Sequence, residues 1–119
     1  FRSLISACLR QYRLPHYFST LLYTMTLQEF KSTLSNSAPP TNLSGSLQAL
    51  WYVGKDDWEQ AHNIAQDIHS PEGSWIHAYL HRQEGDQGNA AYWYHRANQP
   101  VCKTSLQEEW ETIVKALLH

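Results

Sequence analysis

A spacing of 29 residues recurs in the middle of the chain and limits what it can fold into. Shifting the sequence by this amount superimposes three pairs of identical residues: Ala49 on Ala78, Asp57 on Asp86 and Ala61 on Ala90. In each copy two alanines stand twelve residues apart, with an aspartate between them. Facing alanines in an antiparallel helical hairpin let the helix axes approach to about 8 Å. The pattern therefore predicts two stacked helical hairpins, which bury their faces only by stacking.

Signals for helix starts place a further element before these hairpins. Thr26 and Glu29 have the spacing of a capping box, which predicts a short helix over residues 26–35. Residues 35–46 read as a linker, because they are rich in serine and contain two consecutive prolines that exclude helix.

Five more helices are expected after the linker. We expect Ser46 to cap the first, and Asp56 with Glu59 three residues later to form the capping box of the second. Ser70 before a proline is a helix-start signal, and Gly85 supplies a left-handed stop. Nothing in the pattern predicts a strand, so the expected fold class is all-α. The predicted helical ranges are 47–55, 57–68, 70–84, 86–98 and 106–118.

Residues 1–24 differ in composition from the rest of the chain. They contain three arginines and no acidic residue, and the only methionine, Met25, directly precedes the helix start at Thr26. We therefore expect Met25 to be the native initiator and residues 1–24 to be a non-native or disordered extension. A targeting segment and a genuine helix are the alternatives, since transit peptides are also rich in arginine and poor in acids. Residues 25–119 are then expected to form a single domain.

The second hairpin carries small and aromatic residues at a familiar spacing. These residues are Ala78, Gly85, Asp86, Ala90, Tyr94 and Ala97. In this spacing the chain resembles a tetratricopeptide or Sel1-like repeat, over residues 47–100, although Asp56 stands in the first unit where the family has a turn glycine. The resemblance implies about two helical hairpins, with the helices at 26–35 and 106–118 as flanking caps, and a protein- or peptide-binding function. The sequence from Met25 onward is also similar to small bacterial proteins without an assigned function, which implies no activity.

Composition excludes several classes of partner. The formal net charge is −2, which argues against nucleic-acid binding, and no apolar run approaches the ~18 residues of a membrane span. Cys8 and Cys102 do not form a metal-binding pair motif, and two cysteines do not make a disulfide framework. A cytoplasmic protein without a cofactor is expected.

Aromatic and arginine side chains are the candidates for contact with a partner. In the register of the resembling repeat, Trp75, Tyr79 and Arg82 point towards the concave groove that binds extended peptides; the alternative is that they pack beneath the N-terminal helix or the linker. Three successive aromatics cannot all be buried on one helix, so Tyr92 and Trp93 are interface candidates, for instance in a homodimer.

Two histidines could hold a metal. His77 and His81 are four residues apart on one predicted helix, so both rings can face one ion, with a third ligand from Glu84, His62 or His95. The alternatives are that His77 and His81 pack in the core, as the repeat register implies, or make a pH-sensitive contact. The leading hypothesis is a non-enzymatic protein- or peptide-binding module without catalytic residues. A His-rich metal-binding protein or metal-dependent hydrolase, and a structural homodimer, are the alternatives.

Overall fold

The computed structural model describes residues 25–118, and the regular structure in this range is entirely helical. The predicted all-α class is therefore confirmed for these residues, whereas the expectation for residues 1–24 lies outside them. None of the described helices combines the length and apolar character that crossing a bilayer requires. The elements are α2 (Leu27–Ser32), the 3-10 turn η2 (Thr33–Ser35), α3 (Gly45–Gly54), α4 (Trp58–Ala65), α5 (Pro71–Gln83), α6 (Gln87–Ala97) and α7 (Leu106–Leu117).

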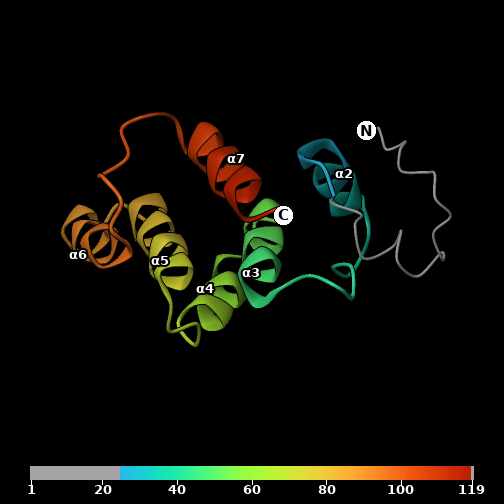
Figure 1. Cartoon of the computed structure of the whole chain (residues 1–119), viewed down its shortest axis with the longest axis horizontal. Helices are drawn as coiled ribbons and strands as arrows, with labels where there is room; N and C mark the ends of the chain where they lie inside the picture. The colour runs from blue at the N-terminus through green and yellow to red at the C-terminus, as the bar shows by residue number, and fades with distance from the viewer. Residues whose placement is uncertain (1–24, 119) are drawn as a thin grey trace, which may run out of the picture.

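The helices α3 to α6 form two antiparallel hairpins, α3 with α4 and α5 with α6 (Figure 1). The two turns share their backbone geometry. Asp56 and Gly85, which are 29 residues apart, both adopt positive φ, at 64° and 93° respectively. Asp57 and Asp86 follow them and cap α4 and α6 by accepting a hydrogen bond from a backbone N–H. The 29-residue spacing seen in the sequence therefore also separates two turns of similar backbone conformation.

Small residues lie where the paired helices touch. Ala49, Ala61, Ala78 and Ala90 are all fully buried, with 0% of their surface exposed. A larger side chain at any of them would have to displace the neighbouring helix, because protein interiors are close-packed. The alanine spacing in the sequence therefore marked the contact faces correctly.

Two helix starts differ from the sequence prediction. Ser44 caps α3, by accepting from the Leu47 N–H at 3.2 Å, and Ser46 lies inside the helix. Asp57 caps α4 in place of Asp56, because Asp56 occupies the left-handed position of the turn and cannot also have the extended backbone of a cap. The predicted starts at Thr26 and Ser70 are confirmed, and Asp86 and Ser105 cap α6 and α7.

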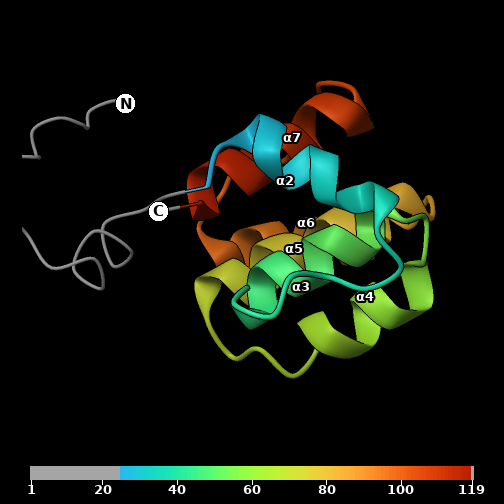
Figure 2. The same ribbon diagram turned by 90° about the vertical axis from the view of Figure 1, so that its right-hand side faces the viewer.

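The helices α2 and α7 lie together across one side of the hairpins (Figure 2). Trp110 of α7 donates its indole N–H to the Leu50 carbonyl of α3 at 2.9 Å, and its ring lies 6.0 Å from that of Phe30 in α2. Lys31 of α2 and Glu111 of α7 form an ion pair at 2.8 Å. The main core is therefore shared by α2, α3, α4, α5 and α7.

We predict that Ala90→Trp lowers the free energy of unfolding by about 1–3 kcal/mol or more, because the indole overpacks the contact between α5 and α6. Ala91→Trp is the matched control, since Ala91 is the next residue and is exposed; it should change stability little. Chemical denaturation of both variants measures the difference. Equal stability of the two would contradict the packing of α6 described above.

Candidate metal centre

Three histidines from two helices converge on one point. His62 comes from α4, whereas His77 and His81 come from successive turns of α5. One ring nitrogen from each lies within 4.8 Å of the other two. The ring centroids of His77 and His81 are 4.9 Å apart, and His62 lies 4.7 Å from His77 and 5.5 Å from His81. We call these residues the histidine trio.

The trio lies largely inside the protein. His77 and His81 are each 8% exposed, and His62 is half-buried. Their position follows from the fold, because α4 ends the first hairpin and packs against α5, which begins the second. The four-residue spacing of His77 and His81 then directs both rings towards α4.

Tryptophan side chains stack on two of the three imidazoles of the trio. Trp58 stacks on His62 with centroids 4.8 Å apart and 12° between the planes, and Trp93 of α6 stacks on His77 at 4.0 Å and 10°. The Trp58 indole N–H is itself fixed, since it donates to the Leu80 carbonyl of α5 at 2.9 Å. These contacts restrict the ring positions from three helices, α4, α5 and α6.

A carboxylate orients the third imidazole. His81 Nδ1 lies 2.7 Å from a carboxylate oxygen of Glu84, one turn later in the chain. With the proton on Nδ1 as donor, the lone pair of His81 is on Nε2. Metal-binding histidines are commonly oriented in this way by a carboxylate on the far nitrogen.

The surroundings favour neutral imidazoles. Burial, and then the neighbouring His62 and His81, lower the pKa of His77 from 6.5 to about 4. Burial also lowers the pKa of His62, and His81 adds to this effect. His62 and His77 therefore have free lone pairs at neutral pH, which is the form that binds a metal.

Of the three groove candidates, Tyr79 and Arg82 lie beside Glu109 of α7. Tyr79 is 3% exposed, and burial raises its pKa to about 12. Arg82 forms an ion pair with the buried Glu109 of α7 at 2.7 Å and also donates to the Thr104 carbonyl. Trp75 packs against both core clusters. The peptide groove that the sequence analysis assigned to these three residues stays a prediction.

Of the two interface candidates, Tyr92 is exposed, whereas Trp93 contacts the histidine trio. Tyr92 is 54% exposed on α6. Trp93 is half-buried and stacks on His77, a contact that the sequence did not reveal. The next residue, Tyr94, is 1% exposed and donates its hydroxyl hydrogen to Glu109. His95 is exposed and takes no part in the trio.

Comparisons with protein-family models, with curated proteins and with solved structures found no match. Any role for the trio therefore has to be argued from its own residues. Sequence reasoning had named His62, His77, His81 and Glu84 but could not select His62 over His95. It missed Trp58, although the spacing of Trp58 and His62 at four residues on one helix is a signal for stacking.

The lowered pKa of His77 predicts a loss of stability in acid. Between pH 6.5 and about 4, the unfolded chain binds a proton at His77 and the folded chain does not, so the free energy of unfolding falls as the pH falls. His77→Phe, which keeps a ring between Trp93 and His81, should show a flatter profile over this range. Denaturation with a metal chelator present measures both profiles. Parallel profiles would show that His77 is not the residue that titrates.

Proposed function

We propose that the protein binds one divalent transition-metal ion, zinc in the first place, through the histidine trio. The convergence of three ring nitrogens within 4.8 Å carries this proposal. Imidazole is a good ligand for zinc, copper, iron and nickel, whereas magnesium and calcium prefer oxygen. The trio contains no thiolate and has one carboxylate beside it. Its ligands therefore suit zinc, copper, iron or nickel better than magnesium or calcium.

A modest rearrangement of the rings completes the site. Zinc bound at about 2.0–2.1 Å in a tetrahedral site holds its ligand nitrogens about 3.3 Å apart. The three ring nitrogens, which lie within 4.8 Å of one another, would have to reach this spacing around the ion. The Glu84 carboxylate beside Nδ1 favours the tautomer that His81 would need.

Three protein ligands leave a fourth position for water or another ligand. Zinc enzymes that activate water have this arrangement. In this protein Glu84, the carboxylate beside the trio, is already the partner of His81, so it is committed to orientation and is not a base for hydrolysis. We therefore propose metal binding as the function and do not propose turnover.

We predict that the untagged protein binds one zinc ion per chain in calorimetry and that magnesium in excess does not compete. A zinc concentration 100-fold above the dissociation constant should stabilise the fold by about 2.7 kcal/mol. His62→Gln should abolish binding, because it leaves two ligands. Glu84→Gln should weaken it about 10–100-fold, the usual effect of removing a carboxylate that orients a metal-binding histidine.

His95→Gln is the matched control for this experiment. It removes an exposed histidine that lies outside the trio. It should leave both the stoichiometry and the affinity unchanged. Absence of stoichiometric zinc binding by the wild-type protein, or equal weakening by His95→Gln and His62→Gln, would overturn the proposed site.

We further propose that the two hairpins are divergent tetratricopeptide- or Sel1-like units. The support is their common turn geometry, with positive φ at Asp56 and Gly85 and an aspartate cap after each. The proposal includes a cytoplasmic location, since the free thiol of Cys102 suits a reducing compartment.

A second candidate function is protein binding through the outer face of α6, with a second copy of the chain as the partner. The specific observation is Tyr92, which is 54% exposed on the last helix of the stack. Arg96 lies 5.8 Å from the centre of its ring and donates to its hydroxyl at 3.3 Å. Exposed aromatic and arginine side chains are the usual centres of protein interfaces.

We predict that light scattering detects a dimer of the wild-type protein and that Tyr92→Ser shifts it to the monomer. The substitution removes the exposed Tyr92 ring but leaves the buried side of α6 intact, so the circular dichroism should not change. A wild-type protein that stays monomeric over the accessible concentration range would rule out this interface between copies.

A further inference from the structure

The three imidazoles of the trio form a nearly equilateral triangle. Their ring centroids are 4.7 Å apart for His62 and His77, 4.9 Å for His77 and His81, and 5.5 Å for His62 and His81. Turning an imidazole about its bond to Cβ changes the plane of the ring but moves its centre little. The coordination geometry that the trio reaches most readily is therefore the one that these separations already approach.

A tetrahedral ion fits this triangle better than a planar one. With metal–nitrogen bonds of about 2.0–2.1 Å, each ring centre lies about 3.2 Å from the ion, and tetrahedral angles place the centres about 5.2 Å apart. In a square-planar site three imidazoles occupy three corners, so two of them lie opposite each other with centres about 6.4 Å apart. The widest pair of the trio, His62 and His81, is 5.5 Å apart. A planar ion would therefore have to separate this pair, whereas a tetrahedral ion needs nearly the separation it has.

Trp58 contacts both members of this widest pair. Its ring stacks on His62, with centroids 4.8 Å apart and 12° between the planes, and meets His81 edge-on at 6.4 Å. Its indole N–H also donates to the Leu80 carbonyl of α5 at 2.9 Å, which holds the indole of α4 against α5. Moving His62 away from His81 would therefore cost either the stack on Trp58 or this hydrogen bond.

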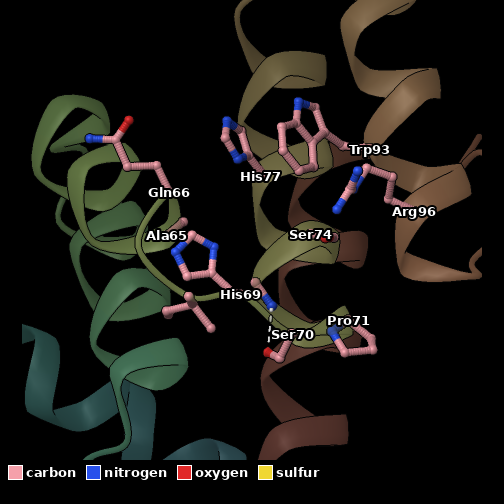
Figure 3. Close-up of a pocket in the computed structure, with 11 residues that line it drawn as sticks. Ala65, Gln66, His69, Ser70, Pro71, Ser74, His77, Trp93 and Arg96 are labelled. Carbon is pink, nitrogen blue, oxygen red and sulfur yellow. Dashed lines mark hydrogen bonds between the residues drawn. The ribbon is translucent and has the colours of Figure 1, made fainter.

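His77 is restrained in a similar way from α6. The Trp93 indole stacks on it at 4.0 Å, and the guanidinium of Arg96 lies 5.5 Å from the centre of the Trp93 ring. Figure 3 shows Trp93 between His77 and Arg96, on the wall of a pocket of about 310 Å³ that is lined by residues of α4, α5 and α6. The contact with a cation on its far face helps to keep the indole against His77.

We propose that Trp58 is a positioning residue that makes the trio selective for ions of tetrahedral preference, zinc and cobalt(II), over copper(II). The proposal rests on the proposed metal binding. Copper(II) binds a given set of nitrogen ligands more tightly than zinc does, so the protein's means of favouring zinc is the geometry that it imposes. Because Trp58 holds His62 beside His81, copper(II) does not obtain the opposite pair of ligands that it prefers, and it loses part of its usual advantage.

Competition of the untagged protein with a chelator measures the dissociation constants of zinc and copper(II) separately, and their ratio tests the proposal. Trp58→Leu removes the ring and should shift this ratio about three- to tenfold towards copper(II), the range that corresponds to one aromatic stack. Trp58→Phe keeps a ring against His62 and should stay near the wild-type ratio. A loss of stability alone lowers both affinities together and does not change their ratio.

Trp75→Leu is the matched control. Trp75 is a half-buried tryptophan of α5 that packs against the core clusters and makes no ring contact with the trio within residues 25–118. This variant should bind both metals in the wild-type ratio.

Three outcomes would overturn the role of Trp58 and leave the proposed metal site standing. They are an equal change in both affinities in Trp58→Leu, a shift in Trp58→Phe as large as in Trp58→Leu, and an equal shift in Trp75→Leu. If the wild-type protein binds neither zinc nor copper(II), the metal site and the role of Trp58 both fail.

Discussion

The close contact of paired helices over alanine is the constraint on which the rest of the structure depends. Ala61 and Ala90 have no exposed surface, and each lies in the second helix of a hairpin. This contact fixes the distance within each hairpin and therefore the position at which α4 meets α5. His62 reaches His77 and His81 only because that meeting occurs. The candidate metal centre is thus a consequence of how the hairpins stack.

Burying the histidine trio costs free energy that an apolar core would not cost. Buried imidazoles must give up water, and the lowered pKa of His77 shows that the folded state resists its protonation. Leucine at the same position would bury apolar surface without this penalty. His77 is stacked between the rings of Trp93 and His81, and these contacts recover part of the cost. The proposed metal binding explains why histidine is present.

The local features of the fold could be predicted from the sequence, but the meeting of separate elements could not. Gly85 and Asp86 identify their turn because positive φ and a cap each require particular residue types. Asp56 misled the prediction, since aspartate suits a cap and a left-handed turn equally well. For the site, the helical period paired His77 with His81. The selection of His62 over His95 depends on the stacking of hairpins, which a one-dimensional period does not contain.

Two consecutive residues of α7 bind different hairpins. Glu109 pairs with Arg82 in the second, and Trp110 donates to the Leu50 carbonyl in the first. Because these two contacts come from neighbouring residues of α7, they fix the distance between the two hairpins. An array with a third hairpin inserted after α6 would move α7 along the stack, and only one of the two contacts could then form. An α7 that makes both contacts therefore fits a pair of adjacent hairpins, as it does in residues 25–118.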